Sequence, residues 1–358
     1  MNPSFWKGRQ VFLTGHTGFK GSWLALWLGT LGARVTGFAL PPPTRPSLFE
    51  LAAVDQDLRS MIGDIRDAKA LAGALRDAQP EVVLHLAAQP LVRASYDDPL
   101  ETFSTNVMGT ANLLEAVRHA PSVRSVVIVT TDKCYENREQ PWGYREADPL
   151  GGHDPYSSSK ACTELVVSSF RASYFAEASR GGHAAAIATA RAGNVIGGGD
   201  WAAERLVPDL LAAFDAGVPA MIRHPGAIRP WQHVLEPLCG YLELAERLHR
   251  DGQAYAEAWN FGPGDDDARP VAWIADTLAS LWGHGASWRA PAGTHPHETH
   301  CLRLDSLKAR TRLGWRPAMR LPEALARVAD WAVARKAGVD LRALTLDQIA
   351  TYQDAVLA

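Results

Sequence analysis

A phenol and an ammonium lie four residues apart in the run His153-Asp154-Pro155-Tyr156-Ser157-Ser158-Ser159-Lys160. In a helix this spacing places both side chains on one face. A phenol titrates near ~10 and can act as a base at neutral pH only where a positive neighbour stabilises its anion. The pair therefore indicates a tyrosine base, Tyr156, assisted by Lys160. An exposed tyrosine beside an unrelated surface lysine would show the same pattern, so further residues must support this interpretation.

A glycine-rich segment near the N-terminus provides that support. An apolar run over residues 10–14 precedes it and an apolar-periodic stretch from Ser22 to Leu31 follows it, which is the order strand, turn, helix. The segment consists of Gly15, His16, Thr17, Gly18, Phe19, Lys20 and Gly21. Gly15 allows the tight turn, Gly18 lets backbone N–H groups approach a pyrophosphate, and Gly21 lets helix and strand pack closely. The segment predicts a dinucleotide site.

Composition limits the class of protein. The chain has 358 residues, 47% of them hydrophobic and 21% charged, so it can bury a substantial core in one large or two fused domains. A net charge of −3 without a long basic run gives a nucleic-acid partner no electrostatic support. The start of the chain has no apolar signal region and no stretch reaches membrane-spanning length, so we expect a cytoplasmic protein without a membrane partner. The four cysteines are widely spaced, which indicates neither disulfides nor a zinc site.

Strand-like apolar runs alternate with helical stretches. This alternation is typical of an α/β fold with a doubly wound parallel sheet of the Rossmann kind. The runs are residues 10–14, 34–40, 82–86, 126–130 and 185–190.

The character of the sequence changes at about Asn194, where glycine, proline and tryptophan become frequent and the apolar runs become shorter. We expect residues 1–193 to form the dinucleotide-binding domain, with a returning segment at about residues 230–262. Residues 194–229 and 263–358 then form a smaller C-terminal α/β domain that binds the substrate, with approximate boundaries.

The end of the second strand lacks the usual signal for NAD. An acidic residue about 20 positions past the glycines commonly binds the ribose 2′-hydroxyl. The run Arg34 to Leu40 offers no carboxylate, and Arg45 in the proline-rich loop after it could meet a 2′-phosphate. This strand therefore leaves the choice between NAD and NADP open.

Two further places suit a flat cofactor. Asp64 and Ile65 are adenine contacts if the carboxylate accepts the amino group, although a turn aspartate is equally consistent. Leu86, Ala87 and Ala88 lie at the end of an apolar strand, where small residues let a cofactor approach the backbone.

Thr131, Asp132 and Lys133 follow the apolar run 126–130. Polar residues at the carboxyl end of a strand in an open α/β sheet face the ligand. The Thr131 hydroxyl could bind a substrate hydroxyl, and Asp132 in a partly desolvated place could hold a proton at neutral pH and act as a general acid. A polar turn without chemistry is the alternative.

Together these motifs resemble the extended short-chain dehydrogenase/reductase family, in which GxxGxxG accompanies Tyr-x-x-x-Lys. From Gly15 to about Pro317 the chain is similar in particular to the CDP-glucose branch of the sugar-nucleotide 4,6-dehydratases. The matching runs are Gly-His-Thr-Gly-Phe-Lys-Gly, Leu-Ala-Ala-Gln-Pro-Leu-Val-Arg, Thr-Thr-Asp-Lys-Cys-Tyr, Asp-Pro-Tyr-Ser-Ser-Ser-Lys, Gly-Asn-Val-Ile-Gly-Gly-Gly-Asp-Trp and Ile-Arg-Pro-Trp-Gln-His-Val. The last two runs separate this branch from the dTDP-glucose and GDP-mannose branches.

The resemblance implies an NAD-dependent hydro-lyase with CDP-glucose as its substrate. Tyr156 takes the proton of the sugar 4-hydroxyl while hydride passes from C4 to nicotinamide, and Lys160 holds the ribose and keeps the phenol acidic. Asp132 protonates the departing 6-hydroxyl, after which the hydride returns to C6. Lys133 stands where the dTDP-glucose enzymes carry the glutamate that removes the C5 proton, so the C5 base is open between Lys133 and another group.

Further site residues come from the same resemblance. Asn106 is implied at the cofactor, although an amide within a helix more often packs or faces solvent. The implied substrate contacts are Gln89, Asn194, Asp200, Trp201, Arg229, His297, Glu298 and His300. Arg229 is the strongest of these, since a guanidinium can bind a phosphate through two hydrogen bonds. No metal is expected, because His297 and His300 have only Glu298 nearby as a further ligand.

Two other functions fit some of these residues, and the resemblance also predicts an oligomeric state. A 4-epimerase, or a dehydratase acting on another nucleotide, would share Tyr156, Lys160 and the cofactor, and Asp132 is the residue that an epimerase would not need. A non-catalytic NAD-binding sensor or scaffold would not need the full set of polar residues. The family resemblance also implies a homodimer built on helices over residues 106–117 and 156–170.

Overall fold

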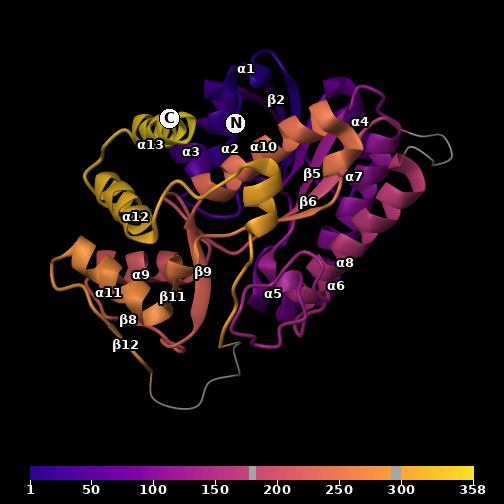
Figure 1. Ribbon diagram of the computed structural model, residues 1–358. Coiled ribbons are helices and arrows are strands. Elements are labelled where there is room, and N and C mark those ends of the chain that lie inside the picture. The colour runs from indigo at the N-terminus through magenta and orange to yellow at the C-terminus, as the bar shows by residue number, and fades with distance from the viewer. Residues whose placement is uncertain (177–182, 292–299) are drawn as a thin grey trace.

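The computed structural model describes residues 1–176, 183–291 and 300–358. Its centre is a seven-stranded parallel sheet with the strand order β10-β6-β5-β4-β1-β2-β3 (Figure 1). The strands are β1 (Gln10–Thr14), β2 (Arg34–Ala39), β3 (Leu58–Ile62), β4 (Val82–His85), β5 (Ser125–Val129), β6 (Ala186–Ala192) and β10 (Ala258–Phe261). This arrangement confirms the predicted doubly wound α/β fold.

The central strands are apolar runs because both faces of the sheet are covered. Every residue of β4, β5 and β6 is buried, as expected for parallel strands between two helical layers. The sequence analysis did not recognise β3, whose residues are half-buried or exposed at the edge of the sheet. Its run Leu-Arg-Ser-Met-Ile is too polar to stand out as a strand without its neighbour β2.

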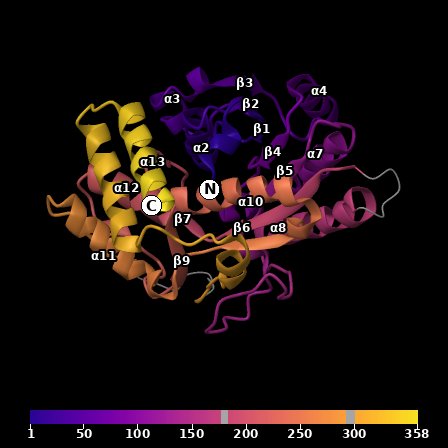
Figure 2. The same ribbon diagram turned by 45° about the horizontal axis from the view of Figure 1, so that its top comes forward.

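Helices cover the two faces of this sheet (Figure 2). On one face, α2 (Phe19–Thr30) and α10 (Leu235–Asp251) pack over Leu13, Leu84 and Val127. On the other face, α4 (Ala68–Ala78), α7 (Gly109–Arg118) and α8 (Pro155–Phe170) pack over Phe12, Val83 and Val126. Alternate residues of each strand thus belong to different cores, as the two-residue period of a strand requires.

Shorter elements connect these layers. They are α1 (Pro3–Trp6), α3 (Leu48–Leu51), η1 (Val54–Asp57), α5 (Val92–Asp97), α6 (Pro99–Phe103), η2 (Ser104–Met108), η3 (Asp132–Cys134), η4 (Arg171–Phe175), η5 (Gly252–Tyr255), η6 (Asp265–Asp267) and η7 (Ala309–Leu313). Within the residues that the structure describes, no helix is long and apolar enough to cross a membrane.

A smaller α/β region lies beside the main sheet, at the left in Figure 1. Its sheets have the orders β11-β9-β7 and β12-β8. The elements are β7 (Asn194–Ile196), α9 (Leu206–Asp215), β8 (Ala220–Met221), β9 (Ile228–His233), β11 (Ala268–Pro270), α11 (Val271–Trp282), β12 (Trp288–Arg289) and α12 (Leu321–Lys336). Helix α13 (Leu341–Leu357) packs against both α12 and α2 of the main fold. In the segment 230–262, β9 belongs to this region, whereas α10 and β10 join the main fold. The exact domain boundaries stay a prediction.

Candidate functional site

The residues singled out from the sequence gather at the carboxyl edge of the main sheet. Its strands are parallel, and Thr14 at the end of β1 is level with His85 at the end of β4. The segments that follow β1, β4 and β5 therefore emerge on one side, and the N-terminus of α8 packs against η3 after β5. This is the edge at which open α/β sheets bind their ligands.

The glycine turn has the geometry of a pyrophosphate site. Gly15 has a φ of +79°, and a Cβ there would lie 2.7 Å from the Ala87 nitrogen. A Cβ on Gly21 would lie 2.0 Å from the Gly15 oxygen, so neither glycine can carry a side chain. Helix α2 begins after Gly18, and no side chain among the described residues caps it. Its first N–H groups and the positive end of its dipole suit a dinucleotide phosphate.

The side chains of the turn mainly fix its own conformation. His16 is buried with Nε2 2.8 Å from the Ser60 hydroxyl, and burial lowers its pKa to about 4, so its imidazole is neutral. The Thr17 hydroxyl donates to the Leu40 carbonyl oxygen at 2.8 Å. These contacts tie the turn to the middle of β3 and to the residue after β2, at the adenosine side expected from the sequence.

The two expected adenine contacts have different surroundings. Asp64 accepts hydrogen bonds at 2.8 Å from the backbone N–H and from Nε of Arg66, and this ion pair holds the pKa of the carboxyl below its usual range. Ile65 is buried against Gly109, where a Cβ would lie 2.5 Å from its Cδ1. Ile65 therefore supports α7, whereas Asp64 lies nearer the surface.

The segment after β4 is held by two polar side chains. The Thr14 hydroxyl accepts from the N–H groups of Leu86 and Ala87, both at 3.2 Å. Asn106 of η2, almost fully buried, accepts from the Gln89 N–H at 2.9 Å and donates to the Gln89 carbonyl at 3.1 Å. The Gln89 amide itself binds Thr102 and the backbone of the same loop. Gln89 shapes this loop, and a direct substrate contact would require it to exchange these bonds.

Tyr156 and Lys160 lie on the first turns of α8, as their spacing predicted. Asp154 caps this helix by accepting from the Ser157 N–H at 2.9 Å, and the Tyr156 N–H donates to the buried Ser95 hydroxyl at 3.1 Å. The Lys160 ammonium donates to the Val129 carbonyl at 3.2 Å, and burial lowers its pKa to about 8.

The ionisation of Tyr156 differs from the sequence-based expectation. Burial raises its pKa to about 12, while a hydrogen bond with Thr131 and the charge of Arg205 act in the opposite direction. We expected Lys160 to favour the phenolate, but its ammonium is directed to the strand carbonyl instead. In this state Tyr156 is a neutral phenol at pH 7.

Thr131, Asp132 and Lys133 form a compact turn opposite α8. The Thr131 hydroxyl donates to Oδ1 of Asp132 at 3.0 Å, and Asp132 is buried. Burial raises the Asp132 pKa, opposed by the charges of Lys133, Arg229 and Lys20. Its Oδ2 atom has no hydrogen-bond partner among the described residues. A carboxyl whose pKa is raised and whose second oxygen has no hydrogen-bond partner among the described residues suits a general acid.

The expected substrate residues surround this turn in part. Arg229 on β9 is buried, donates to the Ile228 carbonyl at 2.9 Å and acts electrostatically on Asp132. Asn194 lies in β7, in register with Trp231 on β9. The Trp201 ring packs against Trp331 with centroids 5.7 Å apart, which indicates a role in packing.

Two cations from separate segments, Arg205 and Lys20, act on Tyr156 and Asp132 respectively. Arg205, which the sequence analysis did not single out, lies before α9 and binds Asp200 at 3.1 Å. Lys20 has its pKa lowered to about 7, first by burial and then by the charges of Arg205 and Lys160. Arg205 was missed because only the fold brings the Asp200 loop near the glycine turn.

The histidine cluster is incompletely described. His297 and Glu298 lie outside the described residues. His300 is exposed, and its backbone N–H donates to the Glu139 carboxylate at 2.5 Å. Within the described ranges, no group of three His, Cys, Asp or Glu side chains is placed to hold a metal ion. The expectation that no metal is bound stays a prediction.

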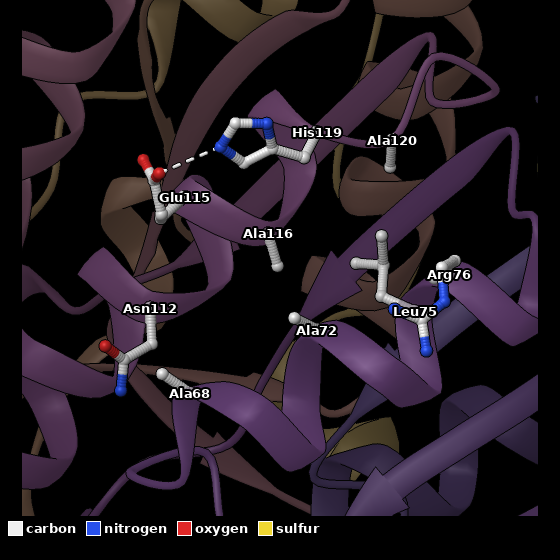
Figure 3. A pocket seen from close by; sticks show the side chains of 9 residues that line it. All are labelled: Ala68, Ala72, Leu75, Arg76, Asn112, Glu115, Ala116, His119 and Ala120. Carbon is white, nitrogen blue, oxygen red and sulfur yellow. Dashed lines mark hydrogen bonds and ion pairs between the residues drawn. The ribbon is translucent and has the colours of Figure 1, made fainter.

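A hollow elsewhere on the surface carries none of these residues. It has a volume of about 170 Å³ and lies between α4 and α7 (Figure 3). Alanines line its floor, and Glu115 and His119 form a hydrogen bond of 3.0 Å at its rim. It lies on the helical layer, away from the carboxyl edge of the sheet.

Comparison with known proteins gives a family match over most of the chain and a relative that matches nearly all of it. The family model described as GDP-mannose 4,6 dehydratase matches residues 12–236. A CDP-glucose 4,6-dehydratase of Salmonella typhimurium strain LT2 is 52% identical over 355 residues, which is 99% of this chain and 99% of that protein.

Two solved structures share the fold. DesIV, a dTDP-glucose 4,6-dehydratase from Streptomyces venezuelae with NAD and TYD bound, is 26% identical with a TM-score of 0.76, covering 92% of this chain and 98% of that one. MoeE5 in complex with UDP-glucose and NAD is 25% identical with a TM-score of 0.76, covering 92% and 99% of the two chains.

Proposed function

The chain belongs to the GDP-mannose 4,6-dehydratase family, and we propose that within this family it is a CDP-glucose 4,6-dehydratase. It converts CDP-D-glucose to CDP-4-dehydro-6-deoxy-D-glucose and water. The observation that carries this conclusion is the 52% identity to a CDP-glucose 4,6-dehydratase over 99% of both chains. The predicted hydro-lyase class and substrate are thereby confirmed.

NAD is the cofactor, as the sequence-based resemblance implied. When bound, it accepts the hydride from C4 of the sugar and returns it to C6. The crowding at Gly15 and Gly21 and the uncapped start of α2, among the described residues, fit its pyrophosphate. The contacts proposed for its adenosine half are His16, Thr17, Asp64 and Ile65.

The first chemical step needs a base at the sugar 4-hydroxyl, and we assign it to Tyr156. The phenol is neutral at pH 7, so it must lose its proton when the ligands bind. Its hydrogen bond with Thr131 and the nearby charge of Arg205 both lower its pKa, and the ammonium of Lys160 on the same helix face can add to them. The 4-ketone formed by this step acidifies the C5 proton.

Asp132 is assigned as the acid that protonates the departing 6-hydroxyl. Burial raises the pKa of its carboxyl, which favours the protonated form that an acid needs, and Oδ2 has no hydrogen-bond partner among the described residues. Lys133, the adjacent residue, is assigned to the removal of the C5 proton. It can accept this proton only as a neutral amine, so the ammonium that acts on Asp132 must first lose its own proton when the ligands bind. Both residues belong to the short turn η3, so the proposed acid and base for the loss of water across C5 and C6 are neighbours in the chain.

The substrate diphosphate is assigned to the cations at the rim of this turn. Arg229 is the main candidate, and Arg205 adds a second guanidinium held by Asp200. Asn194, Trp201, Gln89, His297, Glu298 and His300 remain proposed substrate contacts. Gln89 and Trp201 are the weaker members of this set, because the Gln89 amide is hydrogen-bonded to Thr102 and the Trp201 ring packs against Trp331.

We further propose a homodimer and a cytoplasmic location. Support for the dimer comes from Met108 of η2 and Leu165 of α8, whose side chains are 56% and 60% exposed on the two helical segments that family members pair.

A substrate panel tests the proposed function. The purified protein and NAD are incubated in separate reactions with CDP-glucose, dTDP-glucose, UDP-glucose or GDP-mannose. The masses of the products are measured by mass spectrometry. We expect a product lighter by one water from CDP-glucose at the highest kcat/KM. An unchanged mass with a new 4-epimer would identify an epimerase, and faster water loss from another nucleotide would reassign the substrate.

A further inference from the structure

A buried ion pair lies one helical turn beyond Lys160. Glu164 on α8 and Arg191 on β6 are 5% and 3% exposed. The guanidinium binds both carboxylate oxygens, with Nε 2.9 Å from Oε1 and Nη2 2.8 Å from Oε2. This bidentate geometry is the strongest form of an arginine–carboxylate contact.

Two hydroxyl groups complete the coordination of the carboxylate. Thr130, directly after β5, donates to Oε1 of Glu164 at 2.5 Å, and Thr189 on β6 donates to Oε2 at 2.7 Å. One carboxylate thus joins the helix of Tyr156 to two strands. Thr130 immediately precedes Thr131 and Asp132, so this contact fixes the turn that carries the acid.

The other side of Arg191 holds the far end of the same turn. Its Nη1 donates to the Tyr135 hydroxyl at 2.8 Å and to the Glu146 carbonyl at 3.2 Å. Its guanidinium carbon lies 4.9 Å from the centre of the Tyr135 ring. The segment 130–135 is therefore attached to the ion pair at both ends.

We propose that Glu164 is a positioning residue of the dehydratase site. Its carboxylate fixes α8 against the end of β5 so that Tyr156 and Lys160 face Thr131 and Asp132, and its negative charge holds Lys160 as an ammonium. This inference rests on the proposed function, since it names how that site is held.

The charges around Lys160 support the electrostatic half of the proposal. Burial lowers the pKa of Lys160, whereas Glu164 on its own helix and Cys134 on η3 raise it. Lys160 itself lowers the pKa values of His85 on β4 and Lys20 on α2. Burial keeps the Cys134 thiol neutral by raising its pKa, and it lowers the pKa of His85 to about 3. Burial would also raise the pKa of Glu164, but the bonds from Arg191 lower it. Among these described groups, Glu164 is the anion.

Stability alone gives a poorer explanation of the pair. Replacing a buried ion pair with apolar groups of similar volume is often neutral or stabilising, because two charges must be removed from water. A role in catalysis explains the position of the pair better, because it lies between the helix that carries Tyr156 and the turn that carries Asp132. Removing one partner alone would leave the other charge buried, so both must be changed together.

The test is the double variant Glu164→Gln/Arg191→Met. Its control is Asp57→Asn/Arg342→Met, which removes a half-buried ion pair between η1 and α13, in which Nη2 of Arg342 lies 2.8 Å from both carboxylate oxygens of Asp57. We expect kcat to fall roughly tenfold at pH 8, with little change in the KM for CDP-glucose, and the basic limb of the pH profile to move to lower pH. The control should keep the wild-type limb.

A second measurement separates this inference from the proposed function. The affinity of the apoprotein for NADH is measured by fluorescence titration at a series of pH values, which requires no sugar nucleotide. The fall in affinity caused by deprotonation of Lys160 should move to lower pH in the double variant. Glu164→Asp keeps the charge but shortens its reach, so it should retain the limb while kcat falls. A limb that stays at the wild-type pH in the double variant, with wild-type kcat and only a lower melting temperature, would overturn the proposal.

Discussion

The Asn106 side-chain amide donates to the Ser159 hydroxyl at 2.8 Å, which ties η2 to the helix that carries Tyr156. Ser159 in turn donates to the Tyr156 carbonyl at 2.7 Å. The same amide binds both backbone groups of Gln89. Asn106 therefore connects the segment after β4 to α8, so an amide within a helical stretch has a specific role here.

This connection predicts the effect of Asn106→Ala. The variant leaves buried partners without hydrogen bonds, which should lower the free energy of unfolding by about 1–3 kcal/mol. Because Tyr156 then loses part of its support, kcat should fall more than the affinity for CDP-glucose. Urea unfolding and steady-state kinetics measure the two effects. A stable variant with wild-type kcat would show that η2 and α8 are aligned without this amide.

Tyr156→Phe should abolish the first hydride transfer, with a loss on the order of hundredfold or more in rate. CDP-glucose binding, measured by calorimetry, should stay close to wild type because the ring and its packing remain. Unchanged turnover would exclude Tyr156 as the base.

The dependence of activity on pH should reflect the ionisation of Tyr156 and Lys160. The pKa of Tyr156 is raised, so activity should rise with pH as the deprotonated form becomes more populated. Lys160 loses its proton near its lowered pKa of about 8, so activity should bend downward above that pH. A flat profile of kcat/KM between pH 6 and 9 would contradict this pairing.

Asp132→Asn keeps the shape of the side chain but removes its proton. Oxidation at C4 should continue while water loss slows, so absorbance of reduced nicotinamide should accumulate in stopped-flow mixing. In Lys133→Met, oxidation should also continue, and solvent deuterium should no longer enter at C5. Full-speed water loss in Asp132→Asn, without reduced cofactor, would assign the acid to another group.

The proposed dimer predicts that Leu165→Arg separates the subunits. Leu165 is exposed on α8 and would place a charge in the paired helices, whereas Leu281→Arg on α11 is the matched control at an exposed leucine elsewhere. Light scattering at micromolar concentration should give a dimer for wild type and control, and a monomer for Leu165→Arg. A monodisperse wild-type monomer would contradict the proposed homodimer.

Local patterns predicted the central strands of the main sheet but not its edge strand β3, and they predicted the glycine turn and the placement of Tyr156 and Lys160 on one helix. They did so because strand runs, turn glycines and helix spacing involve residues close in sequence. The contacts of His16 with Ser60 and of Gln89 with Asn106 join distant segments, so the sequence indicated the residues but not what they bind. Glu164 and Arg191 gave no signal, because 27 positions separate them along the chain.

The fate of the hydrogen at C4 tests the central claim most directly. CDP-glucose carrying deuterium at C4 is converted by the protein with NAD, and the product is analysed by NMR and mass spectrometry. A 4,6-dehydratase removes this hydrogen as hydride and returns it within the same turnover, so the label should be recovered at C6 of the 4-keto product. Deuterium retained at C4 of a sugar with unchanged mass, or lost to external NAD without appearing at C6, would contradict the account.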